Sequence, residues 1–411
     1  MSSESSPSTV RDENEASLIW ISAAETSADL HGADLMRFLR QKDPRLNFVG
    51  VGGELMRQEG LECIGRAEDL SSMGISDVLG LLPRVFALYR RIKRILRERP
   101  PLCLILLDAP DFHFRVAKMA SGLDIPVYYY ISPQVWAWRK GRVAFIQKHV
   151  RRMLCILPFE QDFYAQHGVT ADFVGHPLVH YIDSGPQDRD PPRQGRIAVL
   201  PGSRGMEVRR LLPPFAGAAR ILLQRFPDLE FHLIQAPSVA KEELLAHWHK
   251  EVPLEICPFR ERYERIRSCA LALTTSGTSS LECGLLGTPA LVAYKISGLS
   301  YAVARLTVGV PWIGLPNLVL QREVFPEFIQ SRARADLLAD RAAEWLRDPD
   351  ELQRIRADLG TLRLKLGQKR AAQESARIVL EDICPGKAGM DQDTADNTRT
   401  EGTASREGSR S

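Results

Sequence analysis

The segment Cys269–Pro289, CALALTTSGTSSLECGLLGTP, combines hydroxyl side chains with a predicted helix start. The apolar run CALALTT predicts a buried strand, and SSLECGLLG has helical spacing that ends at Gly287. Ser276, Thr278 and their neighbours would then bring hydroxyls and backbone N–H groups to the point where a strand meets a helix N-terminus. Such a junction, turning at Gly277, binds phosphate in open parallel sheets. The alternative is an ordinary capped crossover helix.

Glu282 is expected in the first turn of the same helix. A carboxylate there repels a diphosphate, so toward a nucleotide it should accept hydrogen bonds from neutral hydroxyls such as those of ribose. The alternative is an acid that only stabilises the positive end of the helix dipole.

A second strand-to-helix turn, VLPGSRGMEVRRLLP at 199–213, contains Ser203 and Arg204 between two glycines. A guanidinium at the carboxyl edge of a sheet can bridge diphosphate oxygens with paired hydrogen bonds. The turn lacks the Gly-Lys-Ser/Thr ending of a Walker loop, and the chain lacks GxGxxG, so no nicotinamide cofactor is expected. Arg204 could instead be a surface arginine beside a turn.

The run LLDAPDFHF places Asp108 at the end of an apolar strand and Asp111 three residues later. Acids at that edge face the ligand crevice of doubly wound domains. Either could be a general base if a substrate hydroxyl lies close. For Asp111, capping of the following helix is the preferred interpretation.

Aromatic and cationic residues cluster in two segments that could meet a sugar or a lipid. Trp136 and Trp138 lie among cations in SPQVWAWRKGR and could stack on a ring or hold head groups, or simply be packed inside. The helix predicted over 81–99 is amphipathic and strongly basic, a pattern typical of binding to an anionic membrane surface. Its candidate contact residues are Leu81, Leu82, Phe86, Arg90 and Arg91. A sheet-covering helix is the alternative, and no RNA-binding motif accompanies it.

No metal site is expected from the sequence. The histidines form no HExxH or close cluster. His176 in VGHP could line the cleft, but a structural turn histidine is the preferred interpretation. The seven cysteines lack CxxC pairs and indicate neither a zinc nor a disulfide framework. No acidic DxD pair stands where a metal-dependent sugar transferase needs one. Positive protein groups are therefore expected to meet the leaving diphosphate, with no cofactor.

The elements that position these residues follow a βαβ pattern. Strand-like runs such as SLIWISA, LNFVGVGG, LCLILLDAP and IPVYYYISP alternate with helical segments, which predicts a parallel sheet covered on both faces. AETSADLHG is expected as a turn before the first helix. The pattern restarts at RIAVLPG, so the fold class is α/β with two Rossmann-like doubly wound domains facing a central cleft.

Length and composition fit this organisation. A chain of 411 residues accommodates two domains, and its net charge of +3 does not suggest a dedicated nucleic-acid binder. No apolar run suggests a signal peptide or a membrane span. The predicted divisions are a disordered leader (1–16), an N-terminal Rossmann-like domain (17–183), a linker (184–195), a C-terminal Rossmann-like domain (196–367), a C-terminal helix (368–384) that could return to the first domain, and a disordered tail (385–411).

Taken in order, seven motifs resemble the lipid-A-disaccharide synthase family, glycosyltransferases of the GT-B architecture. They are LLDAPDF, YYISPQVWAWRKGRV, LPFEQDFY, FVGHP, LPGSRGMEV, TSGTSSLECGLLGTP and GLPNLVL, and the likeness runs from about Trp20 to Gly367. The resemblance implies transfer of 2,3-diacylglucosamine from UDP to the 6-hydroxyl of 2,3-diacylglucosamine 1-phosphate, with inversion and without metal. It also implies work at the cytoplasmic face of the inner membrane of a Gram-negative bacterium, and it makes a homodimer conceivable.

Carried over by position, the resemblance gives Asp108 the role of general base and Arg204 that of the diphosphate-contacting arginine. It makes Glu282 the ribose ligand, places Asn317 near the nucleotide, and matches the turn at Ser276. Two further residues of the binding set are Glu25 and Ser27, in the loop SAAETSADLHG.

The chain departs from the family pattern at two positions. Ala28 replaces a glycine of the first loop and tolerates less backbone freedom, which puts the shape of that loop in question. His113 stands where an asparagine is common, and the resemblance assigns it no role.

Three rival interpretations share the same nucleotide turn. They are the peptidoglycan lipid II glycosyltransferase, a UDP-N-acetylglucosamine 2-epimerase, which needs no membrane helix, and a non-enzymatic nucleotide-sugar binder, which does not need Asp108.

Overall fold

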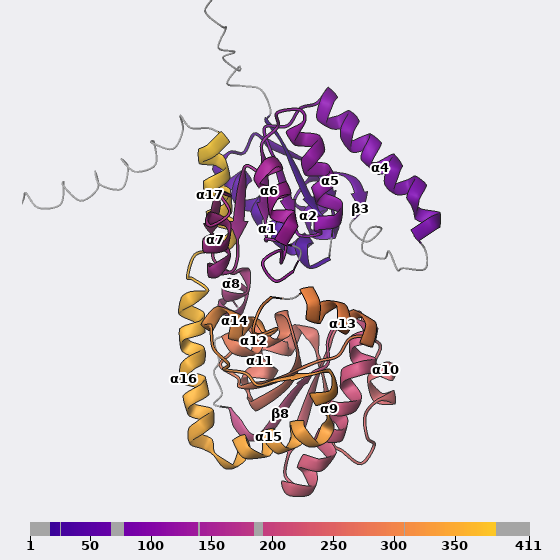
Figure 1. Cartoon of the computed structure of the whole chain (residues 1–411), viewed down its shortest axis with the longest axis vertical. Helices are drawn as coiled ribbons and strands as arrows, with labels where there is room; N and C mark the ends of the chain where they lie inside the picture. Colours follow the sequence, from indigo (N-terminus) through magenta and orange to yellow (C-terminus); the bar gives the residue numbers. More distant parts are fainter. Residues whose placement is uncertain are drawn as a thin grey trace, which may run out of the picture. The chain divides into compact units, whose positions relative to one another are not determined.

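The computed structural model describes residues 17–24, 26–66, 78–138, 140–184, 192–307 and 309–383 (Figure 1). The expected leader, the expected tail and most of the expected linker lie outside these ranges. The chain forms two compact units, one drawn from Met1–Pro133, Lys148–Leu154 and Ala372–Ser411, the other from Gln134–Gln147 and Cys155–Ala371.

One parallel sheet is formed mainly by strands of the first unit. Among the described residues the sheet has the order β3-β2-β1-β4-β5-β6-β7, and the pairs from β3 to β6 are parallel. Its strands are β1 (Ser17–Ala23), β2 (Leu46–Gly52), β3 (Leu61–Arg66), β4 (Leu104–Leu107), β5 (Val127–Tyr130), β6 (Arg152–Cys155) and β7 (Ala171–Phe173). Every residue of β4 is buried, as expected for a parallel strand covered on both faces. SLIWISA is confirmed as β1.

Helices α1 (Thr26–Lys42), α2 (Glu54–Gln58), α4 (Val78–Glu98) and α5 (Pro110–Ser121) connect these strands. The expected turn AETSADLHG is wrong in its second part, because α1 already begins at Thr26. The small polar residues that suggested a turn form the first turns of the helix, a position that such residues also favour.

The second unit contains another parallel sheet, with the order β10-β9-β8-β11-β12-β13 in the described residues. Its strands are β8 (Arg193–Leu200), β9 (Glu230–Gln235), β10 (Glu255–Pro258), β11 (Cys269–Thr275), β12 (Ala290–Tyr294) and β13 (Glu327–Ile329). CALALTT is confirmed as the wholly buried strand β11. The two sheets confirm the predicted α/β class.

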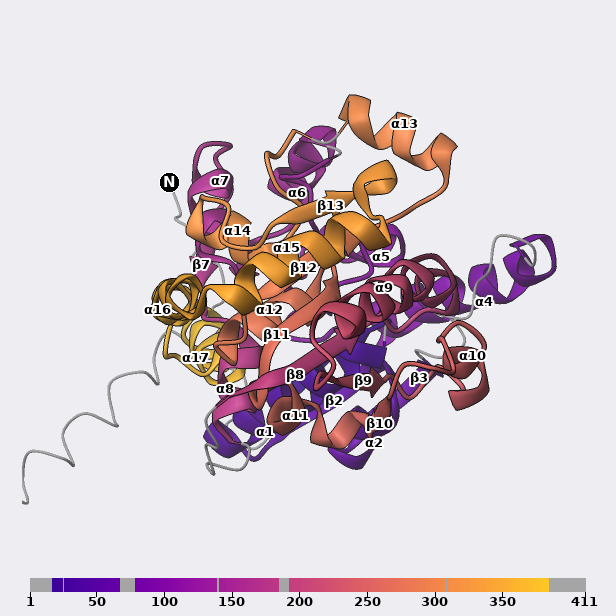
Figure 2. The same cartoon turned by 90° about the horizontal axis from the view of Figure 1, so that it is seen from below.

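The remaining α-helices come from both units, and only some of them surround the second sheet (Figure 2). In the described residues these helices are α6 (Val143–His149), α7 (Pro158–Ala165), α8 (Pro177–Asp183), α9 (Gly205–Arg225), α10 (Lys241–Ala246), α11 (Arg262–Arg267), α12 (Thr278–Leu285), α13 (Gly298–Thr307), α14 (Leu315–Leu320), α15 (Ala335–Arg347), α16 (Pro349–Lys365) and α17 (Ala371–Ile383).

The C-terminal helix α17 is bound to the first unit through Asp382. The Arg151 guanidinium donates to both carboxylate oxygens of Asp382 at 2.6 Å, and the Tyr128 hydroxyl donates to it at 2.6 Å. Because Arg151 donates these bonds, the pKa of Asp382 falls to about 2. The contacts fasten a helix from the end of the chain to strands formed more than 200 residues earlier.

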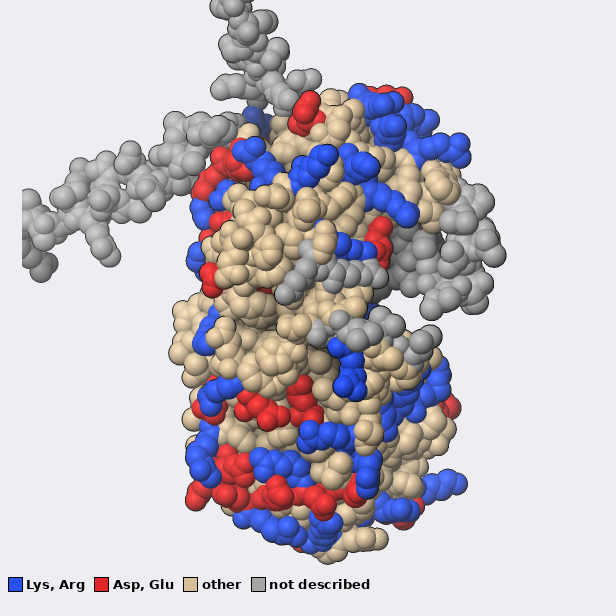
Figure 3. All heavy atoms as spheres, viewed as in Figure 1, with Lys and Arg blue, Asp and Glu red and all other residues tan. Residues whose placement is uncertain are grey.

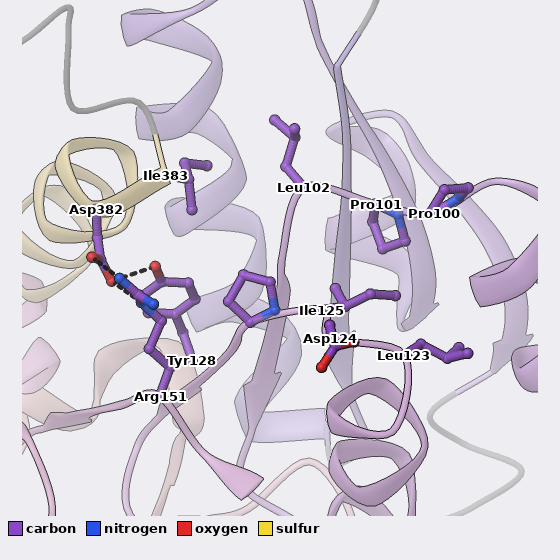
Figure 4. Close-up of a pocket in the computed structure, with 11 residues that line it drawn as sticks. Pro100, Pro101, Leu102, Leu123, Asp124, Ile125, Tyr128, Arg151, Asp382 and Ile383 are labelled. Atoms are coloured by element: carbon purple, nitrogen blue, oxygen red, sulfur yellow. Dashed lines mark hydrogen bonds and ion pairs between the residues drawn. The ribbon is translucent and has the colours of Figure 1, made fainter. Parts of the chain in front are cut away.

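A pocket opens beside this ion pair (Figure 4). Its wall includes Pro100, Leu102, Leu123, Tyr128, Arg151 and Asp382. Pro100 and Leu102 precede β4, Leu123 precedes β5, Tyr128 lies in β5 and Arg151 precedes β6, so the pocket lies at the amino ends of these strands, and Asp382 comes from α17. The predicted site residue Asp108 follows the carboxyl end of β4 and belongs to the opposite edge.

Candidate functional site

Asp108 and Ala109 connect β4 to α5 through two successive residues with positive φ, +52° and +44°. For residues other than glycine such a conformation costs on the order of 1–3 kcal/mol each and persists only where neighbouring groups impose it. The Asp108 side chain is half-buried at the carboxyl edge of the sheet. The turn therefore needs an external support.

That support is a set of hydrogen bonds to the Asp108 backbone carbonyl. It accepts from the Tyr129 hydroxyl at 2.5 Å and from His113 Nδ1 at 2.7 Å. On the other side of the imidazole, Nε2 lies 2.8 Å from the hydroxyl oxygen of Ser22 on β1. Three elements thus hold the turn in place.

His113 is wholly buried, and burial lowers its pKa to about 4, so the ring is neutral near pH 7. A carbonyl can only accept, so Nδ1 must carry the proton and Nε2 must accept from the Ser22 hydroxyl. The residue that the sequence left without a role therefore fixes the backbone of the predicted base.

Asp111 does not cap the next helix, contrary to expectation. Helix α5 begins at Pro110, and its N-cap residue is Ala109, so Asp111 does not hold the N-cap position. Asp111 is an exposed acid within the first turn.

The first loop is partly described. Glu25 lies outside the described residues, and the Ser27 side chain does as well. Asp29 accepts hydrogen bonds from the backbone N–H groups of Gly53 at 2.8 Å and Leu55 at 2.9 Å, so it holds the start of α2. Ala28 is buried inside α1, where a helix requires no glycine freedom, so this departure from the family pattern is accommodated.

In the second unit, the predicted phosphate turn joins β11 to α12. Gly277 has φ +111°, a value that favours glycine, and α12 starts at Thr278. The Ser276 hydroxyl donates to the Ile313 carbonyl at 2.8 Å. The first N–H groups of a helix have no partner within it, so the amides of Thr278 and Ser279 mark an anion-binding end.

Glu282 lies in the second turn of α12, because the helix begins earlier than the sequence suggested. It is only 6% exposed, and its Oε1 accepts from Arg262 Nε at 3.0 Å. Burial raises the pKa of Glu282, while the Arg262 charge acts in the opposite direction. A mere helix-dipole role is therefore wrong; Glu282 belongs to a buried polar cluster.

Arg262 is the residue of this cluster that sequence reasoning missed. Its guanidinium carbon lies 3.9 Å from the ring centroid of Phe259 and 4.0 Å from that of Tyr263. It also donates to the Tyr263 hydroxyl at 2.7 Å. Arg262 is thus held between two rings in the geometry of cation–π pairs. The aromatic and arginine alternation in PFRERYER was the available signal.

Arg204 is the exposed N-cap residue of α9, directly after Ser203. The turn depends on Gly202, which has φ +109° and where a Cβ would lie 2.5 Å from Glu207 Oε2. The Ser203 carbonyl accepts from the Ser238 hydroxyl at 2.5 Å. The backbone of this turn is therefore fixed while the Arg204 side chain stays at the surface.

Asn317 differs from the expected nucleotide contact. Its Nδ2 donates to the Phe325 carbonyl at 2.7 Å and to Glu327 Oε1 at 2.9 Å, and its Oδ1 accepts from the Val324 and Phe325 N–H groups. This buried amide has no donor or acceptor left for a ligand. It is a structural residue.

Glu327 completes this network and had no sequence signal. Its carboxylate accepts from the N–H groups of Ile313 at 3.0 Å and Gly314 at 2.9 Å. Since Ile313 also receives the Ser276 hydroxyl, the network connects Asn317 to the phosphate turn.

Trp136 and Trp138 occupy different environments. Trp136 is 7% exposed, donates to Glu160 Oε1 at 2.9 Å and meets the Phe159 ring edge-on, so packing, the alternative interpretation, applies to it. Trp138 is 41% exposed.

His176 is the N-cap of α8 and accepts from the Leu178 N–H at 3.2 Å, which confirms its structural role.

Helix α4 separates apolar and basic surfaces. Ile92 and Leu96 are buried, whereas Arg90 and Arg91 are exposed and Phe86 is 62% exposed. The side chains of Leu81 and Leu82 lie outside the described part. Figure 3 shows lysine and arginine side chains gathered over this helix. Across the described residues, we find no helix with the length and apolar character needed to cross a bilayer.

Comparison with known proteins identifies relatives over nearly the whole chain. The model of the lipid-A-disaccharide synthetase family matches residues 19–381. The lipid-A-disaccharide synthase of Anaeromyxobacter sp. (strain K) is 40% identical over 369 residues, covering 88% of this chain and 96% of that protein. The enzyme of the same name from Myxococcus xanthus (strain DK1622) is 37% identical over 380 residues, covering 90% and 98%.

Solved structures share the fold at low identity. The glycotransferase of kitacinnamycin has a TM-score of 0.61 at 14% identity, covering 90% of this chain and 99% of its own. The UDP co-structure of S. aureus MnaA has a TM-score of 0.60 at 12% identity, covering 89% and 97%. The calicheamicin glycosyltransferase CalG4 gives 0.58 at 13% identity, covering 90% and 100%. Together these neighbours support the GT-B architecture.

Proposed function

Because this chain belongs to the lipid-A-disaccharide synthase family, it is a UDP-sugar-dependent glycosyltransferase of lipid A synthesis, and we propose its substrates and the residues that act on them. The donor is UDP-2,3-diacylglucosamine and the acceptor is 2,3-diacylglucosamine 1-phosphate. The products are the lipid A disaccharide 1-phosphate and UDP, formed with inversion. The observation that carries this proposal is the family match over residues 19–381.

We assign acceptor and membrane binding to the first unit and the UDP-sugar to the second. Asp108 removes the proton from the acceptor 6-hydroxyl as that oxygen attacks the anomeric carbon opposite UDP. Its position at the carboxyl edge of the sheet and its doubly hydrogen-bonded backbone support the role, since a general base must be held in a defined place.

Positive protein groups stabilise the leaving diphosphate. Hydrogen bonds reach the diphosphate, where negative charge develops, from the Arg204 guanidinium and from backbone N–H groups at the start of α12. These N–H groups lie near Ser276, Gly277 and Thr278. Ser203 and Ser276 position these turns through their backbone and hydroxyl contacts. Glu282, oriented by Arg262, accepts from ribose hydroxyls. Glu25 and Ser27 remain proposed contacts.

Helix α4 places the enzyme on an anionic membrane surface, at the cytoplasmic face of the inner membrane. Exposed Phe86 and the cations Arg90 and Arg91 form the proposed contact of the first unit, with Leu81 and Leu82 nearby in the sequence. Exposed Trp138, in the second unit, remains a separate proposed contact. We retain a homodimer as part of the proposal.

The test is a reaction of purified protein with both lipid substrates in detergent, followed by mass spectrometry. A tetra-acylated disaccharide phosphate and free UDP are expected. Asp108→Asn should lower kcat by about 10²–10⁴-fold, the usual contribution of a general base, and leave UDP affinity unchanged. Asp111→Asn is the matched control, because this exposed acid lies three residues away, and it should retain activity. Full activity of Asp108→Asn would remove Asp108 from the base role.

A further inference from the structure

Three side chains with metal-binding atoms meet at the edge of the second sheet. His232 lies on β9, and Glu255 and Cys257 lie on the edge strand β10 (Figure 2). His232 and Glu255 are register partners in a parallel pair, and Cys257 is two residues further, so all three project from the same face. Their ligand atoms lie within 4.8 Å of one another.

The His232 imidazole is buried with its Nε2 toward two carboxylates, and neither of them makes a good hydrogen bond with it. The residue is 1% exposed, and its Nδ1 has no hydrogen-bond partner. Its Nε2 lies 3.4 Å from Glu255 Oε2 and 3.8 Å from Glu230 Oε2, separations too long for good hydrogen bonds.

The same separation suits two ligands of one metal ion. Tetrahedral zinc binds His nitrogen and carboxylate oxygen at about 2.0–2.1 Å, which places such ligand atoms roughly 3.3–3.4 Å apart. Imidazole, carboxylate and thiolate together form a set that zinc accepts. The other oxygen of Glu255 accepts from Arg265 at 2.9 Å, a contact that fixes the carboxylate with Oε2 toward His232.

We propose that His232, Glu255 and Cys257 bind one Zn²⁺ as a structural site that fastens the edge strand β10 to β9. On binding, the Cys257 thiol releases its proton to solvent and the thiolate sulfur forms the bond to zinc. Water or Glu230 fills the fourth position. This site is separate from the transfer chemistry, and it stabilises the strand that leads into α11, the helix carrying Arg262.

The test uses untagged protein stripped with chelator and then titrated with Zn²⁺ against a chromophoric competitor. We expect one equivalent bound per chain with a Kd at or below about 1 μM. Co²⁺ in place of Zn²⁺ should give a thiolate-to-cobalt charge-transfer band. Binding of less than one equivalent, or the absence of that band, would overturn the proposal.

Variants separate this site from other thiols. Cys257→Ser should weaken Zn²⁺ binding by at least about 100-fold, and Glu255→Gln, at an exposed position that tolerates substitution, by at least about 10-fold. Cys63→Ser and Cys384→Ser are the controls and should bind as the wild type does. Unchanged affinity in folded Glu255→Gln, or loss of binding in a control, would refute the assignment.

Discussion

His113 makes one hydrogen bond to the Asp108 carbonyl and one to Ser22, and two amide substitutions can remove these bonds one at a time. They test whether His113 supports the Asp108 turn. An asparagine Nδ2 occupies the place of His Nδ1, and a glutamine amide can occupy that of Nε2. His113→Asn therefore keeps the bond to the Asp108 carbonyl and loses the bond to Ser22, whereas His113→Gln does the reverse.

The magnitudes follow from what each variant leaves unpaired. Two residues in positive φ store on the order of 2–6 kcal/mol, and two hydrogen bonds to the Asp108 carbonyl, from Tyr129 and His113, offset about 1–3 kcal/mol of it. His113→Gln removes one of them, so the turn relaxes, and displacement of a base by about 1 Å costs roughly 10²-fold in rate. His113→Asn leaves the buried Ser22 hydroxyl unpaired, which should cost about 1–3 kcal/mol of stability while the turn keeps its shape.

The assay pairs steady-state kinetics of disaccharide formation with urea unfolding. We expect His113→Gln to lower kcat by about 10–100-fold with little change in KM, and His113→Asn to stay within a few-fold of wild type in kcat while unfolding at lower urea. Ser22→Ala is the control that should leave kcat unchanged. If His113→Gln kept its kcat while His113→Asn lost it, support of the Asp108 carbonyl would not be what positions the base.

Three further results are expected. Glu282→Gln should raise KM for the UDP-sugar about 10-fold and spare kcat, because one charge-assisted hydrogen bond to ribose is lost; an unchanged KM would place the ribose elsewhere. Asp382→Asn should lower the free energy of unfolding at pH 7, since Arg151 loses its ionic partner. The depressed pKa of Asp382, about 2 against 3.8, makes this difference full well above pH 3.8, and the difference is lost as pH falls through about 2; a pH-independent difference in urea unfolding would contradict it. The double substitution Arg90→Glu and Lys93→Glu should lower the affinity for anionic vesicles, measured by co-sedimentation, at least about 10-fold. An equal loss of affinity for zwitterionic vesicles would argue against α4 as the contact.

The local pattern was sufficient for the strands and for the turns that carry the candidate site. CALALTT predicted a covered parallel strand, and the glycines at 202 and 277 marked turns, where the structure has positive φ. Asp108 was predictable for the same reason, since an acid that ends a buried run must lie at a sheet edge. Element boundaries were less certain: α1 and α12 begin earlier than expected, and this alone moved Glu282 out of the first turn.

What the sequence by itself determined is therefore the alternation of strands and helices, the two nucleotide-fold halves and the position of each turn, because these depend on neighbours within a few residues. Tertiary structure alone decided the partners. Ser22 contacts His113 from 91 positions away in the sequence. The Asn317 amide uses all of its donors and acceptors within the protein, and His232 lies close to Glu255 and Cys257. Such pairings depend on strand order and register, which place side chains distant in sequence at one point, and no local periodicity records them.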